Sequence, residues 1–240
     1  MLSGTNQAQL TDQAVEAWTA VDDELERALG LGPLSWVLRW DGRKQESIAA
    51  SEEALAILRR SQDRRLILRG LVWLSQSFAD AGDVAATEAV LDEADELAGG
   101  EQSWELAATY GDCAEYRGDH LEAVRRYAES LSWTSTTGES HQMLADMRCL
   151  AANTAPLGEG EATLEIAELA RLEERRTGRA GRSPVMMEWF ERGVATAREL
   201  VGPAAAEQIA ERARDVPPPK RAERAIELAT AILAARTVQD

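Results

Sequence analysis

The sequence is poor in the residues on which most enzymatic and metal chemistry depends. Its 240 residues include two histidines, two cysteines and only two lysines, Lys44 and Lys220. HExxH, GxSxG, GxxxxGK[ST] and GxGxxG are all absent. No motif is therefore present for a zinc protease, a serine hydrolase, a phosphate-cradling loop or a dinucleotide site. We predict a protein that is not an enzyme and that uses no cofactor or metal.

Long apolar runs are also missing. No stretch of 18 apolar residues occurs, so we predict no membrane span. The first residues, MLSGTNQAQLTDQ, lack a basic segment followed by an apolar one, which argues against a secretion signal. Cys113 and Cys149 show no CxxC spacing. We therefore expect reduced core thiols in a cytoplasmic protein.

Basic residues are outnumbered, 26 against 42 acidic residues, and the net charge is −16. Such a surface repels phosphate backbones, so we predict no direct nucleic-acid binding by this chain. The acidic surface would attract a basic protein or peptide, or it serves solubility alone. Four arginines lie in or directly before the segment RTGRAGRSP. They could contact an anion or simply belong to a solvated loop: Arg175, Arg176, Arg179 and Arg182.

Strong helix formers (Ala, Leu, Glu and Arg) dominate what is present, and no alternating strand pattern competes. We predict an all-α protein in which residues 1–8 are loose. Pro33 is expected to begin a short helix. The predicted helices cover 11–29, 33–41, 44–61, 64–81, 84–98, 102–117, 120–133, 138–155, 160–176, 184–201, 203–214 and 218–237.

Four glycines mark an internal repeat. Gly42, Gly82, Gly118 and Gly158 are spaced 40, 36 and 40 residues apart, and each separates two helical segments. These intervals are typical of stacked helix pairs. A glycine that adopts the left-handed conformation ends a helix at little cost, so each is predicted to form the bend of a pair.

Small residues keep register with these glycines, seven positions before, five after and twelve after each one. Two antiparallel helices approach closely only where the side chains at their crossing are small. The four-fold register therefore predicts four tightly crossed helix pairs. The small residues are Ser35, Ser75, Gly111, Ala151, Ser47, Thr87, Ala123, Thr163, Ala54, Ala94, Ser130 and Ala170.

This pattern resembles the tetratricopeptide (TPR) family, whose repeats carry small residues and a glycine at these places. The best unit is TYGDCAEYRGDHLEAVRRYAESL, residues 109–131. The resemblance implies a TPR-like α-solenoid over residues 1–183. It also implies that the first helix of each unit lines a concave face.

Beyond residue 184 the register fails, because Glu207 and Arg214 stand where small residues would be required. We predict a separate helical cap over residues 184–240. Its segment ARELVGPAAAEQIAERAR resembles the end of the TPR region in large ATP-binding bacterial transcription regulators of the LuxR type. That resemblance covers about residues 64–235. It implies a protein-interaction or signal-sensing module of a bacterial regulator.

Family geometry assigns concave positions in the second to fourth units, and a mixed groove with an acidic centre would suit a basic peptide. Alternative functions are a small-molecule sensor and a self-associating scaffold, and the Trp36–Trp40 pair could form a ligand or homodimer patch. The predicted partner-binding residues are Arg69, Gln76, Glu105, Asp112, Glu115, Tyr116 and Arg148.

Overall fold

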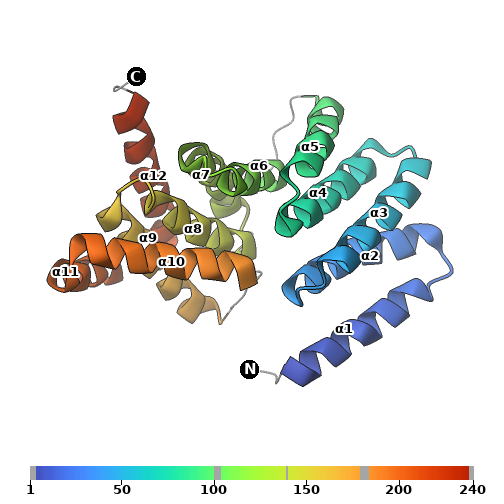
Figure 1. Ribbon diagram of the computed structural model, residues 1–240, viewed down its shortest axis with the longest axis horizontal. Coiled ribbons are helices and arrows are strands. Elements are labelled where there is room, and N and C mark those ends of the chain that lie inside the picture. Colours follow the sequence, from blue (N-terminus) through green and yellow to red (C-terminus); the bar gives the residue numbers. More distant parts are fainter. Residues whose placement is uncertain (1–3, 100–103, 139, 179–183, 238–240) are drawn as a thin grey trace. The chain divides into compact units, whose positions relative to one another are not determined.

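The computed structural model describes residues 4–99, 104–138, 140–178 and 184–237, and over these ranges every regular element is helical (Figure 1). The first compact unit spans Met1–Glu101 and the second Gln102–Asp240. The first contains α1 (Gly4–Thr19), α2 (Glu24–Trp40), α3 (Lys44–Arg60), α4 (Arg64–Ala81) and α5 (Val84–Ala98). The second contains α6 (Trp104–Tyr116), α7 (His120–Thr137), α8 (Ser140–Thr154), α9 (Gly160–Thr177), α10 (Pro184–Val201), α11 (Pro203–Arg214), the 3-10 turn η1 (Pro218–Lys220) and α12 (Arg221–Thr237).

The predicted bends are confirmed. Gly42, Gly82, Gly118 and Gly158 all have positive φ angles, between 75° and 82°. After two of them an aspartate caps the next helix, since the carboxylate of Asp83 accepts from the N–H of Ala86, and Asp119 does the same for Glu122. Glycine and aspartate together end one helix and begin the next within three residues.

The N-terminal boundaries differ from the prediction. Residues 4–8 are helical rather than loose, and the predicted helix 11–29 is interrupted between Thr19 and Glu24. Asp23 causes the restart, because its carboxylate accepts from the N–H of Glu26. Pro33 begins no helix and lies inside α2. Its side chain is exposed there.

All twelve small residues of the repeat are buried, and the eleven that carry a side chain are 0% exposed. At Gly111 a Cβ atom would lie 2.8 Å from the Tyr127 ring, so only glycine fits beneath that ring. The helices of the four predicted pairs pack on one another, α2 on α3, α4 on α5, α6 on α7 and α8 on α9. The small-residue register therefore predicted real contacts between helices.

In the first unit, two glycines of α2 admit indole rings. A Cβ at Gly30 would lie 2.0 Å from Trp18 of α1, and one at Gly32 would lie 2.3 Å from Trp73 of α4. Trp73 is 5% exposed and therefore belongs to the core of this unit. Glycine is a poor helix former, and its presence at both positions of α2 is explained by the close approach of an indole ring to the backbone.

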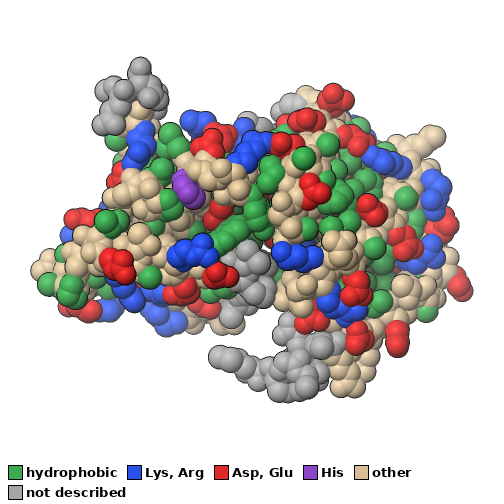
Figure 2. All heavy atoms as spheres, viewed as in Figure 1, with side chains coloured by type: hydrophobic (Ala, Val, Ile, Leu, Met, Phe, Trp, Pro, Cys, Tyr) green, Lys and Arg blue, Asp and Glu red, His purple; other side chains and the backbone are tan. Residues whose placement is uncertain are grey.

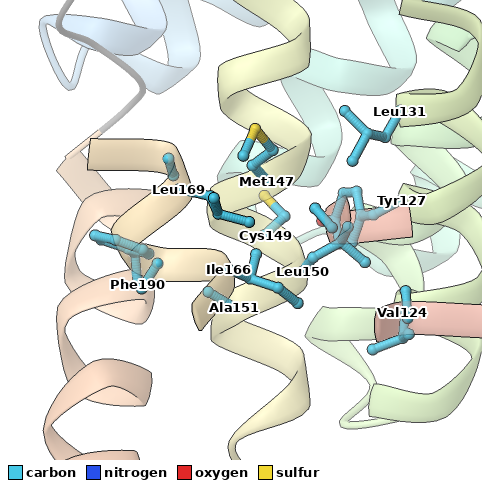
Figure 3. Close-up of a cluster of buried hydrophobic side chains, with 14 of the residues drawn as sticks. Val124, Tyr127, Leu131, Met147, Cys149, Leu150, Ala151, Ile166, Leu169 and Phe190 are labelled. Atoms are coloured by element: carbon cyan, nitrogen blue, oxygen red, sulfur yellow. The ribbon is translucent and has the colours of Figure 1, made fainter. Parts of the chain in front are cut away.

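In the second unit, the core is formed mainly by α7, α8, α9 and α10, with Tyr127, Leu150, Ile166 and Phe190 among its large buried side chains (Figure 3). Helix α10 packs on α8 and α9, and α11 packs chiefly on α9. Helix α12 returns across α7, α8 and α9. The predicted boundary at residue 183 lies within this unit, and the distinction between repeats and cap stays a prediction.

Gly202 differs from the repeat glycines, in keeping with the lost register. Its φ of 83° is combined with a ψ of 160°, whereas Gly82 has φ 82° and ψ 13°. Gly202 therefore gives an extended kink before Pro203 rather than a left-handed helix cap. Helices α10 and α11 pack only weakly on each other as a result.

The described residues include no helix that is both long and apolar enough to cross a membrane. On the face shown in Figure 2, acidic and basic side chains are interspersed instead of gathering into one patch of a single sign.

Candidate functional site

A hollow of about 320 Å³ lies within the second unit, between α6, α8 and α10. Its lining combines two aromatic rings, three charged or titratable side chains and a floor of small residues. We call it the α6–α8–α10 hollow. It contains two of the residues that the sequence predicted for partner binding, Glu115 and Tyr116.

The floor of the hollow results from a close crossing of α8 and α10. A Cβ at Gly193 would lie 3.1 Å from the Cα of Ala152 and 3.2 Å from the carbonyl oxygen of Ala151. Ala152 and Ala155 line the hollow and are 8% and 2% exposed. Small side chains at this crossing leave room above them for a side chain from outside.

One wall of the hollow is aromatic. The rings of Tyr116 and Trp189 meet edge to face, with centroids 4.8 Å apart and an interplanar angle of 76°. Both rings are half-buried. Such a wall offers apolar contact to an alkyl chain, and the face of an indole also attracts cations.

The acidic group of the hollow is Glu115. Its Oε2 accepts a hydrogen bond of 3.0 Å from the buried hydroxyl of Tyr127, which also donates to Oδ1 of Asp112 at 2.6 Å. Burial, followed by the charge of Asp112, raises the pKa of Tyr127 well above 10.0, so the hydroxyl keeps its proton. Tyr127 therefore fixes the Glu115 carboxylate at the edge of the hollow.

His120 contributes a second polar group. Its Nδ1 lies 2.9 Å from Oδ1 of Asn153, and Nδ2 of Asn153 donates to the carbonyl oxygen of Cys149. Because Asn153 thus presents its oxygen to the ring, Nδ1 of His120 is the donor. His120 is thus half-buried and hydrogen-bonded.

Arg192 brings a positive charge to the outer rim. Its Nη2 lies 2.6 Å from Oε1 of Glu188, one helical turn earlier, and both side chains are largely exposed. This ion pair directs the charge of Arg192 toward a carboxylate of its own helix.

Two other predicted partner-binding residues of the second unit, Asp112 and Arg148, do not line the hollow. Asp112 is 6% exposed and stands behind Glu115. Arg148 is 3% exposed, pairs with Glu174 at 2.7 Å and packs over the Phe190 ring. Glu105 falls outside the residues whose side chains the structure describes.

Arg69 and Gln76 belong to the first unit. Arg69 is exposed and lies over the ring of Trp73, 5.4 Å from its centroid. The side-chain oxygen of Gln76 accepts from Trp36 and Arg39, at 3.0 and 3.2 Å. The seven predicted partner-binding residues thus belong to helices α4, α6 and α8. Their role in binding stays a prediction.

Sequence reasoning missed the α10 side of the hollow, including Trp189, Gly193 and Thr196. These residues stand four and three positions apart, a spacing that places them on one helical face. That signal was available, but the repeat register ended before it.

No protein family, curated protein or solved structure matches the chain. Within the described residues, no group of three or more His, Cys, Asp or Glu side chains is arranged to hold a metal ion.

Proposed function

We propose that this chain is a TPR-like α-solenoid that binds a partner protein or peptide, with a basic side chain of the partner entering the α6–α8–α10 hollow. The observation that carries the proposal is the combination of an Ala and Gly floor, the Tyr116–Trp189 wall and the fixed carboxylate of Glu115. The left-handed glycines and buried small residues support the TPR-like part.

The chemistry of the hollow fits a lysine or arginine. The alkyl stem of such a side chain would lie on the alanine floor and against the Trp189 ring, where apolar contact is favourable. Its cationic end would reach Glu115 and form a charge-assisted hydrogen bond, which is stronger than a neutral one. Partial burial weakens screening by salt, although the interaction remains salt-dependent.

The resemblance to LuxR-type regulators leads us to propose that this module belongs to a bacterial transcription regulator and senses or recruits a protein signal. We also propose a cytoplasmic location, supported by Cys113 and Cys149, which are buried and form no disulfide.

A peptide library displayed on phage would test the binding function. Selection on the wild type should be followed by counter-selection on Thr196→Trp, which fills the hollow from an exposed position. We expect the enriched peptides to share a lysine or arginine. We also expect Glu115→Gln and Trp189→Ala to weaken the binding of these peptides by about tenfold or more. Enrichment that the filled hollow leaves unchanged would contradict the proposal.

A second candidate, small-molecule sensing, is favoured by a larger hollow of about 1140 Å³ between α7, the end of α9 and α12. Hydroxyl residues of α7, such as Ser132 and Ser135, line it, together with apolar residues of α12, such as Ile226 and Ala234. This volume is suitable for a small organic ligand. A metabolite that raises the melting temperature of the wild type but not of Ile226→Trp would support this function.

A further inference from the structure

An exposed apolar stripe runs along α2 in the first unit. Leu25 is 41% and Leu29 36% exposed, Pro33 is exposed, and Trp36 and Trp40 are half-buried. With 3.6 residues per turn, these five side chains fall within an arc of about 80°. We call them the α2 stripe.

The other faces of α2 are already used. Gly30 receives Trp18 from α1, and Gly32 receives Trp73 from α4. Leu31, Leu34 and Leu38, which are 1–4% exposed, belong to a core shared with residues of α3. Leu25, Leu29 and Pro33 are thus the part of the stripe that the described neighbours leave open, whereas Trp36 packs partly against the core and donates to Gln76. Apolar side chains repeated along one helical face are typical of a surface that receives another helix.

The charges around the stripe define its partner. Both arginines of α2 are ion-paired, Arg27 with Glu53 at 3.2 Å and Arg39 with Asp80 at 2.7 Å. By contrast, Asp22 and Glu26, beside Leu25, are exposed and have no ion pair within the described part of the chain. The uncompensated charge at this end of the stripe is therefore negative.

Pro33 adds a further feature. Proline has no N–H, so it cannot donate the helical hydrogen bond to the carbonyl of Leu29. An acceptor without this helical donor lies between the two apolar ends of the stripe.

We propose that the α2 stripe docks a basic amphipathic helix of another protein. Its leucines or similar side chains would cover Leu25, Leu29 and the two indole rings, and its lysines or arginines would face Asp22 and Glu26. This surface is separate from the α6–α8–α10 hollow, and neither depends on the other.

A designed peptide provides the test. It is a helix of about four turns, with leucine at every third or fourth position and lysine elsewhere. Fluorescence anisotropy of the labelled peptide would be measured against the full chain and against Leu25→Glu/Leu29→Glu. Both leucines are exposed, so the variant should fold, as circular dichroism would verify.

We expect the double variant to bind at least about tenfold more weakly, although its added negative charges would strengthen non-specific attraction of lysine. Asp22→Asn/Glu26→Gln should weaken binding several-fold and reduce its salt dependence. Leu200→Glu, at a leucine on α10 that is 59% exposed, is the matched control and should bind as the wild type does.

Three results would overturn the proposal. The first is equal binding by folded Leu25→Glu/Leu29→Glu, and the second is equal binding of a peptide with glutamate in place of lysine. The third is a chain that does not bind the peptide but has a doubled molecular mass in solution, with the doubling abolished by Leu25→Glu/Leu29→Glu. The stripe would then join two copies of this chain. Filling the hollow by Thr196→Trp should not change the affinity for this peptide. The two proposals can therefore fail independently of each other.

Discussion

The contacts of the helix pairs and those of helix α12 differ in how plainly the sequence shows them. In the pairs α2–α3 through α8–α9, small side chains that are 0% exposed let the helices approach closely. Helix α12 also buries small side chains, Ala225 and Ala229, and is joined to α9 by ion pairs from Arg221 to Glu173 and from Arg224 to Glu165. Both regions therefore combine close packing with ion pairs, and only the pairs repeat their small residues in register.

This difference has a consequence for reading the sequence. A small-residue crossing recurs in every unit and therefore leaves a register that can be counted. An ion pair such as Arg221–Glu173 joins residues 48 positions apart and occurs once. Nothing in the local sequence distinguishes these two residues from solvated charges.

The largest effect is expected from Arg221→Ala. It leaves Glu173, which is 2% exposed, with only the ion pair from Arg176, whose side chain is half-exposed. An uncompensated buried carboxylate is costly, and we expect a loss of about 2–4 kcal/mol, reduced by the remaining Arg176 pair. Urea unfolding should be compared with Arg214→Ala, which removes an exposed pair with Glu207. Equal midpoints would show that the ion pair does not hold α12.

Removal of the Tyr127 hydroxyl is expected to come next. Tyr127→Phe takes a donor from Asp112 and Glu115, for a loss of about 1.5–3 kcal/mol near neutral pH. Because the folded pKa of Tyr127 is raised, its contribution is complete below about pH 10 and is lost as the pH rises through the higher folded value. The wild type should therefore lose more stability than Tyr127→Phe between about pH 9 and 11. Parallel curves for the two proteins would contradict this.

A crossing position gives a similar or smaller effect. Ala94 of α5 is 0% exposed, and Ala94→Leu should cost about 1–3 kcal/mol because the larger side chain forces the helices apart. Ala89 of the same helix is exposed, and Ala89→Leu should change stability by less than about 0.5 kcal/mol. Chemical denaturation would compare the free energies of unfolding of the two variants, which carry the same alanine-to-leucine substitution. A small effect at Ala94 would remove the physical basis of the repeat register.

The smallest effect concerns an exposed pair. Arg43 donates to Glu46 and lowers the pKa of that carboxyl below 4.5. Its stabilisation is therefore present above about pH 4.5 and is lost as the pH falls through the lower folded value. Because solvent screens this exposed pair, we expect it to contribute about 0–1 kcal/mol to stability. Melting curves from about pH 6 to 3 should be flatter for Glu46→Gln than for Glu52→Gln, an exposed position on the same helix. Identical slopes would exclude a contribution from the pair.

Much of the fold could be predicted because helix ends and crossings are local. Gly82 and Asp83 define a bend by backbone conformation and capping alone. Pro33 could not be placed in the same way, because its position inside α2 depends on tertiary packing around Gly30 and Gly32. For the hollow, the family positions led to Glu115 and Tyr116 on α6. Trp189 was missed because α10 follows a different pattern, and only tertiary structure places it against Tyr116.

The most direct measurement of the proposed function is a double-mutant cycle at the hollow. Isothermal titration would give the affinities of wild type and Glu115→Gln for one selected peptide, with its anchoring lysine present or replaced by norleucine. Norleucine keeps the alkyl stem and removes the charge. We predict that this replacement weakens binding by about tenfold in the wild type and by much less in Glu115→Gln, because the pair interacts directly. An equal loss in both proteins would show that Glu115 does not receive the basic side chain, and would contradict the proposed mode of binding.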